Sequence, residues 1–228
     1  MPQEFRTISG GLIDRSKEIS FIFNGKKYLG YKGDTLASAL LANGIHLIGR
    51  SFKYHRPRGI LAAGVEDSNG KVQLYKENIT EPNVNLTEVE LVEGLRIESQ
   101  NCWPSVNFDL GAINNFLSRF FPAGFYYKTF MWPKSFWYKV YEPFIRKIAG
   151  FGIASLEKDK ERYEHKYEYC DLLVTGSGPA GLSSAYAAAK NGAKVILAED
   201  KLRFGGSLLT DDVTIDNLSG KAWTDKII

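Results

Sequence analysis

A glycine-rich stretch between two apolar segments constrains the fold of this chain more than any other feature. Residues 171–200 read DLLVTGSGPAGLSSAYAAAKNGAKVILAED. Within them, 172–175 form a short apolar run of strand-forming residues, which predicts a buried strand. The sequence GSGPAG follows at once, at 176–181, and fits the pattern G-x-G-x-x-G. A strand that leads directly into this pattern predicts the phosphate-binding turn of a dinucleotide-binding domain.

Each glycine of the pattern has a separate expected role. Gly176 permits the tight turn after the strand, Gly178 lets the backbone approach a pyrophosphate, and Gly181 lets the next helix pack close to the sheet. The helix, expected over 182–190, would direct its free N–H groups and the positive end of its dipole at the phosphates. The alternative is a glycine-rich turn without a ligand, which the flanking strands and helix disfavour.

An acidic residue and a second glycine pair extend the pattern. Residues 194–198 predict a second strand, which ends at Glu199, 18 residues after Gly181. A carboxylate there accepts hydrogen bonds from a ribose 2′-OH and repels a 2′-phosphate, which disfavours NADP. The Gly205-Gly206 pair that follows is similar to that of the two-dinucleotide-binding-domain flavoproteins. Because those proteins bind FAD or NAD with the same first βαβ unit, the motif alone leaves both cofactors open.

The composition excludes several classes of protein. The chain has 228 residues, 44% hydrophobic and 24% charged, with a net charge of +3, which is too small to favour nucleic acid or an anionic membrane as a partner. Its two cysteines, Cys102 and Cys170, exclude a disulfide scaffold and a four-cysteine metal site, and its three scattered histidines predict no metal ligand. With no apolar run of 18 residues and no apolar signal-peptide core, a cytoplasmic protein is expected.

A β-hairpin followed by a helix is expected near the N terminus. Residues 19–31 contain two strand-like runs joined by Asn24-Gly25, the strongest short hairpin turn. Asp34 is the expected N-cap of a helix that Gly44 closes. A hairpin and then a helix open a β-grasp, ferredoxin-like domain, and its later strands are expected at 72–75, 86–91 and 95–99.

The loop after this helix carries no cluster ligands. Plant-type ferredoxins place C-x₄-C-x₂-C ligands for a [2Fe–2S] cluster there. Residues 49–59 read GRSFKYHRPRG and contain no cysteine, so the β-grasp domain is expected to lack a cluster. The loop's four basic residues favour docking of an acidic partner surface, or a solvated loop, over nucleic-acid binding.

The middle of the chain is rich in aromatic residues. Residues 116–144 contain 13 aromatics among 29 residues, rimmed by lysines, which favours an interdomain or subunit interface over an irregular packed linker. The charge-rich segment 158–169 then leads into the nucleotide domain. The fold class is therefore α+β followed by α/β, with a β-grasp domain over 1–100, an aromatic-rich connecting or interface segment over 101–169, and the first part of a Rossmann-type FAD/NAD-binding domain over 170–228.

Several runs spread along the chain are more specific than the glycine pattern. They are GDTLASALLANG at 33–44, GRSFKYHRPRGI at 49–60, TEPNV at 80–84, SQN at 99–101 and PAGFYYKTFMWP at 122–133. With the glycine pattern, they resemble the N-terminal part of the alpha subunit of heterotetrameric sarcosine oxidase.

The resemblance implies a cofactor and a set of binding residues. It implies a β-grasp domain without a cluster and NAD as a tightly bound, non-redox cofactor, with FAD as the alternative at the same motif. Carried onto this sequence, the residues near the pyrophosphate are Gly176, Gly178, Ala180 and Gly181. Those along the adenosine ribose are Glu199, Asp200 and Lys201, and those closing over the phosphates are Gly206 and Ser207. No catalytic residue and no metal ligand is expected in this chain.

The resemblance also implies an activity and partners. The family demethylates sarcosine to glycine, reduces O₂ to hydrogen peroxide and passes the one-carbon unit to tetrahydrofolate, with FMN and FAD in the complex and beta, gamma and delta subunits beside alpha. The alternatives are the alpha subunit of a related proline, hydroxyproline or opine dehydrogenase, and a non-catalytic binding or assembly fragment. Substrate identity and stoichiometry stay open.

The length of the chain leads to a further expectation. The family's alpha subunit is several times longer than 228 residues. A lone βαβ unit cannot bury both faces of its parallel strands. The chain is therefore expected to be a fragment or a truncated reading frame, with an unfinished nucleotide site and no activity alone.

Overall fold

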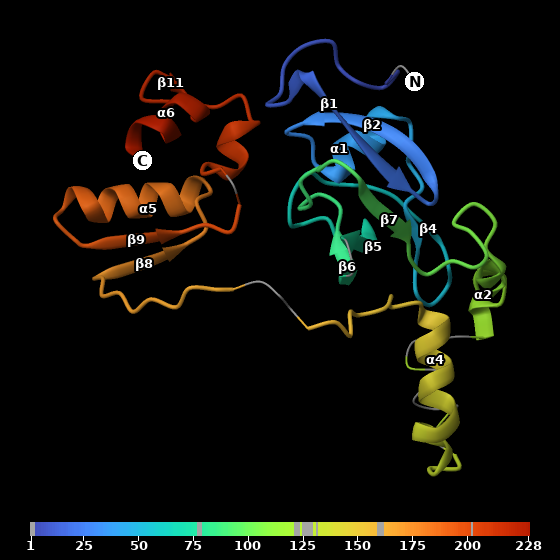
Figure 1. Ribbon diagram of the computed structural model, residues 1–228. Coiled ribbons are helices and arrows are strands. Elements are labelled where there is room, and N and C mark those ends of the chain that lie inside the picture. Colours follow the sequence, from blue (N-terminus) through green and yellow to red (C-terminus); the bar gives the residue numbers. More distant parts are fainter. Residues whose placement is uncertain are drawn as a thin grey trace. The chain divides into compact units, whose positions relative to one another are not determined.

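The computed structural model divides into two units, Met1–Asp159 and Lys160–Ile228, each described by itself. It describes residues 3–76, 79–120, 124, 130, 132–158, 162–201 and 203–228 (Figure 1). Residues 121–123, 125–129 and 131 of the predicted aromatic-rich segment lie outside the described residues, as do residues 159–161 of the predicted charged linker. Among the described residues, no helix has the length and apolar character needed to cross a membrane.

The N-terminal unit begins with the predicted hairpin. Strands β1 (Asp14–Phe23) and β2 (Lys26–Lys32) pair antiparallel, with Phe23 opposite Lys26. Asn24 and Gly25 have φ of 49° and 75°. Both values are positive, as the tightest hairpin turn requires, because that turn matches the right-handed twist of the strands. The hairpin prediction is confirmed.

The hairpin belongs to a five-stranded mixed sheet of order β2-β1-β7-β5-β6. Strand β7 (Leu95–Ser99) runs parallel to β1 and antiparallel to β5 (Lys71–Lys76). Both were predicted within a residue. Strand β6 (Ile79–Asn85) lies at the edge and was missed, because Pro82 and Asn83 are typical of a loop. An edge strand tolerates a proline, since the missing N–H interrupts no ladder between strands.

The predicted strand at 86–91 is wrong. This segment forms turns that cover the N terminus of helix α1 (Leu36–Ala42). The carbonyl of Val89 accepts a hydrogen bond from the N–H of Leu36 at 2.8 Å, and that of Leu86 accepts one from Ala37 at 3.2 Å. The segment thus satisfies N–H groups that every helix leaves without an intrahelical partner.

The N-cap of α1 is Thr35, not the predicted Asp34. The Thr35 hydroxyl accepts from the N–H of Ser38 at 3.2 Å. Asp34 is 1% exposed and instead accepts two hydrogen bonds from the guanidinium of Arg6, at 3.0 and 2.6 Å, and one from the N–H of Tyr31 at 2.8 Å. Both residue types cap helices well, so the pattern alone does not separate two adjacent candidates.

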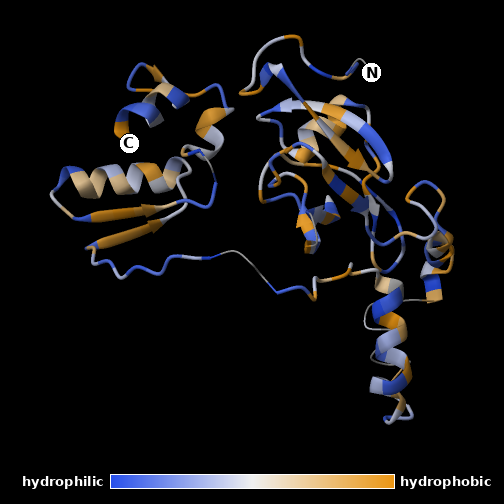
Figure 2. Ribbon diagram, viewed as in Figure 1, coloured by the Kyte–Doolittle hydropathy of each residue, from blue (hydrophilic) through white to orange (hydrophobic). Residues whose placement is uncertain are grey.

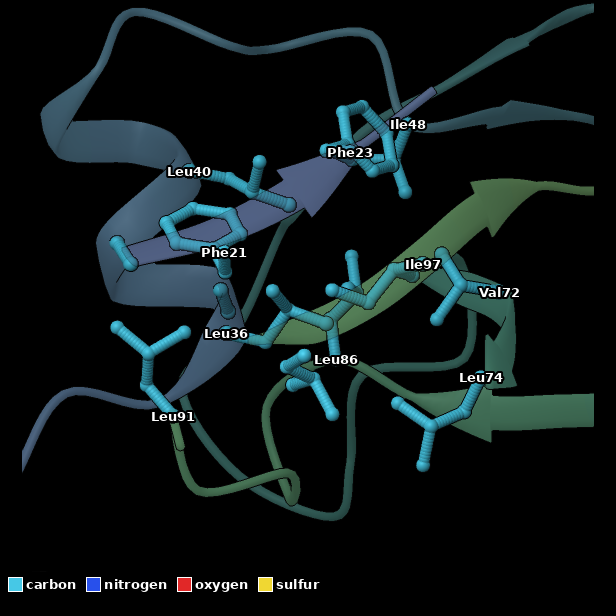
Figure 3. Close-up of a cluster of buried hydrophobic side chains, with 13 residues drawn as sticks. Phe21, Phe23, Leu36, Leu40, Ile48, Val72, Leu74, Leu86, Leu91 and Ile97 are labelled. Atoms are coloured by element: carbon cyan, nitrogen blue, oxygen red, sulfur yellow. The ribbon is translucent and has the colours of Figure 1, made fainter. Parts of the chain in front are cut away.

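One side of α1 forms the core with the sheet (Figure 3). Leu36 and Leu40 project from the helix toward Phe21 of β1 and Ile97 of β7, and all four are 0% exposed. The rest of the N-terminal unit consists of short elements, which are β3 (Gly49–Arg50), β4 (Pro57–Arg58), η1 (Leu110–Ala112), α2 (Ile113–Phe116), η2 (Ser118–Phe120), η3 (Trp137–Tyr141) and α4 (Glu142–Ala149).

A buried carboxylate organises the loop before β5. Asp67 is 2% exposed and accepts hydrogen bonds from four backbone N–H groups, those of Leu61, Ala62, Asn69 and Gly70, at 2.7 to 3.1 Å. Burial acts to raise the pKa of Asp67, but these hydrogen bonds outweigh it and lower the pKa from 3.8 to about 2. A lowered pKa stabilises the fold above the unfolded value of 3.8, and this contribution is lost as the pH falls toward 2.

Replacing Asp67 by asparagine is therefore expected to lower the free energy of unfolding by about 2 kcal/mol at pH 7. The difference in unfolding free energy between variant and wild type should shrink below pH 4. In that range the wild-type Asp67 carboxyl takes up a proton when the protein unfolds, which favours the unfolded state. Denaturant unfolding at pH 7 and pH 3 measures both values, with Glu81→Gln, an exposed change on β6, as the control. An equal loss at the two pH values would contradict the assignment.

The C-terminal unit starts with the predicted strand–turn–helix–strand. Strands β8 (Leu172–Thr175) and β9 (Val195–Ala198) pair in parallel, joined by helix α5 (Pro179–Lys190). The helix begins three residues before the predicted Leu182, because proline is favoured at the first helical position, where its missing N–H leaves no hydrogen bond unmade. The remaining elements are η4 (Gly206–Leu209), β10 (Thr214–Ile215), β11 (Leu218–Ser219) and α6 (Gly220–Ile227).

A small core joins these last elements to α5. Leu182, Leu208 and Trp223 are buried together, with Leu197 and Leu218 packed against them. Strand β8 gains little from this core, since Leu172 and Leu173 are 36% and 57% exposed. Figure 2 shows β8 and β9 as hydrophobic strands. The parallel pair thus keeps apolar surface uncovered, as expected for a single βαβ unit.

Candidate nucleotide-binding site

The turn between β8 and α5 gives each glycine of the pattern a distinct environment. Gly176 has a φ of 88°, which favours glycine, and its N–H donates to the carbonyl of Ala198 at 2.7 Å. A Cβ on Gly178 would meet no atom of the described residues within 4 Å, so the backbone here is open to an approaching group. A Cβ on Gly181 would overlap the carbonyl oxygen of Gly176, so the helix packs against the turn only without a side chain there.

The N terminus of α5 faces this turn without a side-chain cap. Gly178 occupies the N-cap position, Pro179 begins the helix, and within the described part of the chain no side-chain hydrogen bond caps it. Ala180, also predicted near the pyrophosphate, lies in this first turn and is exposed. Uncapped N–H groups and the positive end of the helix dipole favour an anion at this position.

Glu199 follows β9 and is held by four donors. Its Oε2 accepts from the N–H of Ser177 at 2.7 Å and from the Ser177 hydroxyl. Its Oε1 accepts from the N–H groups of Asp200 and Lys201, both at 3.0 Å. The carboxylate is therefore fixed at both oxygens between the glycine turn and the start of the next loop. Asp200 and Lys201 contribute backbone N–H groups to this arrangement, and both residues are exposed.

The same contacts set the charge of Glu199. Burial acts to raise the pKa of Glu199, but the hydrogen bonds outweigh burial and lower the pKa from 4.5 to about 2. Among these hydrogen bonds, the one from the Ser177 hydroxyl has the largest effect. The carboxylate is therefore ionised throughout the neutral range. An ionised carboxylate attracts the hydroxyl groups of a ribose and repels a 2′-phosphate.

The predicted Gly205-Gly206 pair lies against the glycine turn. The N–H of Gly205 donates to the carbonyl of Ser177 at 3.0 Å and to its hydroxyl at 3.2 Å. A Cβ on Gly206 would lie 3.0 Å from the Cα of Gly178, so the two backbones are in close contact. Ser207 is the second residue of η4, and its carbonyl accepts from the N–H of Thr210 at 3.1 Å. All nine predicted binding residues thus lie on the turn, the first turn of α5, or the two loops beside them.

Ser177 is the residue that sequence reasoning missed. It occupies a variable position of the glycine pattern, and nothing in the sequence distinguishes it from a spacer. In the structure it is 0% exposed and contacts both Glu199 and Gly205.

The loop at 49–59 lies in the N-terminal unit, closed by the pairing of β3 with β4. Arg50 donates to the carbonyl of Val106 through Nε at 2.9 Å and Nη2 at 2.7 Å. His55 Nδ1 lies 2.7 Å from Oδ2 of Asp109, and the two residues are 5% and 9% exposed. The prediction of a solvated or docking loop is therefore wrong for Arg50, which binds within the unit, and His55 is packed within the same unit.

A cavity of about 570 Å³ also lies in the N-terminal unit. It is bounded by β5 and β7 on one side and by α4 and the segment that follows it on the other, and its lining includes Tyr75, Glu98, Arg146 and Phe151. None of its lining residues belongs to the predicted nucleotide site.

Two families match separate parts of the chain. Residues 16–102 match a family described as a 2Fe-2S iron-sulfur cluster binding domain. Residues 171–223 match a family described as FAD dependent oxidoreductase. The fold is therefore a ferredoxin-like domain followed by a region of FAD-dependent oxidoreductase type, in a mixed α/β chain.

The residues present do not fit the cluster named in the first description. Such clusters need four ligands, mostly cysteine thiolates, and this chain has only Cys102 and Cys170, one in each unit. Burial, and next the charge of Asp109, raise the pKa of the Cys102 thiol to about 11, so it is protonated at neutral pH. Among the described residues, no group of three or more His, Cys, Asp or Glu side chains is placed to hold a metal ion.

Two full-length relatives and one solved structure resemble the chain as a whole. Sarcosine oxidase subunit alpha of Rhizobium meliloti (strain 1021) is 54% identical over 97% of this chain, which spans 22% of that relative. Sarcosine oxidase subunit alpha of Corynebacterium sp. (strain U-96) is 27% identical over 96% of the chain, which spans 18% of it. The crystal structure of L-proline dehydrogenase from P. horikoshii matches with a TM-score of 0.52 and 17% identity, covering 94% of this chain and 31% of that one, and supports the fold alone.

These matches confirm the expected relation to an oxidoreductase subunit. The agreement extends over both units and includes the segment between them, rather than the glycine pattern alone. Along nearly its whole length, this chain belongs with the alpha subunits of sarcosine oxidase.

Proposed function

We propose that this chain is the nucleotide-binding, N-terminal part of the alpha subunit of a sarcosine oxidase complex. An identity of 54% over 97% of the chain supports the assignment to this subunit. The complex would demethylate sarcosine to glycine, form hydrogen peroxide from O₂, and transfer the one-carbon unit to tetrahydrofolate. The chain spans about a fifth of the relatives that it matches, so these activities belong to the complex rather than to these residues alone.

The C-terminal unit would begin a Rossmann-type domain that holds NAD tightly. The observation that carries this proposal is the open backbone at Gly178, beside an uncapped helix N terminus and 21 residues before an ionised Glu199. A pyrophosphate fits at Gly178, because this residue has no side chain to exclude it. The adenosine ribose fits at Glu199, because the carboxylate accepts hydrogen bonds from hydroxyl groups.

FAD is the second candidate for the same site. The description of the family that matches residues 171–223 favours it. FAD and NAD share the adenosine diphosphate half that this turn and carboxylate would bind, so the residues in this chain serve either cofactor. When bound, a flavin supplies electron acceptance, whereas NAD held here would remain non-redox.

The residues of this chain would bind and orient rather than react. Gly176, Gly178, Ala180 and Gly181 would lie along the pyrophosphate, and Glu199 with the backbone of Asp200 and Lys201 along the ribose. Gly206 and Ser207 would close over the phosphates. These residues would neither transfer a proton nor act as a nucleophile.

The segment 101–169 would contact other subunits. Many of its described aromatic residues are more than half exposed in this chain, namely Trp103, Phe108, Phe116, Phe120, Trp132, Tyr138, Phe144, Phe151, Tyr163, Tyr167 and Tyr169. Exposed aromatic side chains are enriched at protein interfaces, because they combine large apolar area with few rotatable bonds. The beta, gamma and delta subunits of the complex are the proposed partners.

Purification of the protein from its source cells, with its accompanying chains, tests the function. The complex is expected to form hydrogen peroxide on addition of sarcosine and not on addition of proline. Its denatured extract is expected to contain NAD and flavins, identified by mass spectrometry. The 228-residue chain alone is expected to be inactive and serves as the control. Turnover with proline in place of sarcosine would overturn the substrate, and an extract without any dinucleotide would overturn the nucleotide site.

A further inference from the structure

The residue that connects the parts of the nucleotide site is Ser177, which is 0% exposed. Its N–H and its hydroxyl both donate to Oε2 of Glu199. Its carbonyl and its hydroxyl oxygen both accept from the N–H of Gly205, at 3.0 and 3.2 Å. One small side chain thereby joins the glycine turn, the end of β9 and the Gly205-Gly206 loop.

The Ser177 hydroxyl is a side-chain donor to Glu199. The other three donors are backbone N–H groups, of Ser177, Asp200 and Lys201. These donors contact both oxygens of the carboxylate and so restrict its rotation. A Glu199 held in this way cannot turn aside from a ligand that repels it.

We propose that Ser177 determines the selectivity of this site for a ribose with a free 2′-hydroxyl, by fixing the Glu199 carboxylate in the position that a 2′-phosphate would need. Specificity of this kind depends on retaining a repulsive group where the wrong ligand binds, as well as on attracting the right one. Glu199 supplies the negative charge, and Ser177 prevents that charge from moving away. Ser177 is therefore a positioning residue, and the inference rests on the proposed nucleotide site.

Two probes separate selectivity from simple binding. ADP-ribose carries a free 2′-hydroxyl on its adenosine ribose, and 2′-phospho-ADP-ribose carries a phosphate there. Both are titrated calorimetrically into the native complex after its nucleotide has been removed. Wild type is expected to bind ADP-ribose at least about 100-fold more tightly, because the Glu199 carboxylate and a 2′-phosphate carry like charges.

Ser177→Ala is expected to lower this preference about tenfold, the factor typical of one lost hydrogen bond to a charged group. Most of the change should come from tighter binding of 2′-phospho-ADP-ribose, because Glu199 is then able to rotate away from the phosphate. A merely structural role would weaken both probes alike and leave the ratio unchanged. Ser177→Gly, which also removes the hydroxyl and adds no atom, replaces the alanine variant if that variant folds poorly.

Two further variants complete the design. Ser184→Ala removes an exposed hydroxyl on α5 that donates to the carbonyl of Ala180, and should leave the preference at the wild-type value. In a Glu199→Gln background, the Ser177 change should have no additional effect, because Ser177 acts through the charge of Glu199. An unchanged ratio in Ser177→Ala overturns the inference and leaves the nucleotide site standing. Failure of wild type to bind either probe overturns both.

Discussion

Replacing Gly178 with alanine is expected to reduce dinucleotide affinity about 100-fold or more while leaving the unfolding transition of the protein unchanged. Gly178 has a φ of −64°, which alanine adopts freely, and none of the residues that the structure describes places an atom within 4 Å of the position of its Cβ. The new methyl group therefore fits the free protein. It would occupy the space through which a pyrophosphate approaches the backbone. Dinucleotide bound per chain and thermal unfolding measure the two effects.

Gly181→Ala is the matched control, because it adds the same methyl group three residues further along. There a Cβ would overlap the carbonyl oxygen of Gly176, so the variant should lose stability as well as nucleotide. Comparison of the two variants thus distinguishes Gly178, which is needed for ligand binding, from Gly181, which is needed for the packing of α5 on β8. Full nucleotide occupancy in a folded Gly178→Ala protein would exclude the turn from the site.

In the N-terminal unit the largest expected effect is that of Phe21→Ala. Phe21 is 0% exposed and lies on β1 among the side chains of α1 and β7 (Figure 3). Removing the ring loses its transfer free energy and leaves a cavity, which together cost about 3–5 kcal/mol of unfolding free energy. Denaturant unfolding followed by circular dichroism measures the loss.

Phe116→Ala is the control for this change, since Phe116 is 87% exposed and the same atoms are removed. Its unfolding free energy should stay within about 0.5 kcal/mol of wild type. If Phe21→Ala were equally mild, the core described here would not be what stabilises the unit.

Most elements predicted correctly depend on local sequence. The Asn24-Gly25 turn specifies its own hairpin, and the glycine pattern specifies the strand, turn and helix around it, because the conformations that these residues permit are few. Strand β6 was missed for the opposite reason. Its Pro82 disfavours a strand locally, and only the place of β6 at the edge of the sheet makes the proline harmless.

The candidate site divides in the same way. The glycines and Glu199 were predicted as site residues because their spacing along the chain fits the dinucleotide-binding pattern. Ser177 was not, because its importance arises from hydrogen bonds to Glu199 and Gly205, 22 and 28 residues away. The contact of His55 with Asp109 spans 54 residues and has no signature in the sequence at all. Long-range polar pairs of this kind become visible only once the backbone is placed.

Hydrogen bonds within the N-terminal unit hold the loop at 49–59 in place. Arg50 and His55 attach it to residues 106–109 through hydrogen bonds that the polypeptide supplies by itself. The shape of the loop is thereby coupled to a segment that lies far away in the sequence, since His55 and Asp109 are 54 residues apart. A substitution at residues 106–109 would therefore alter the loop as well.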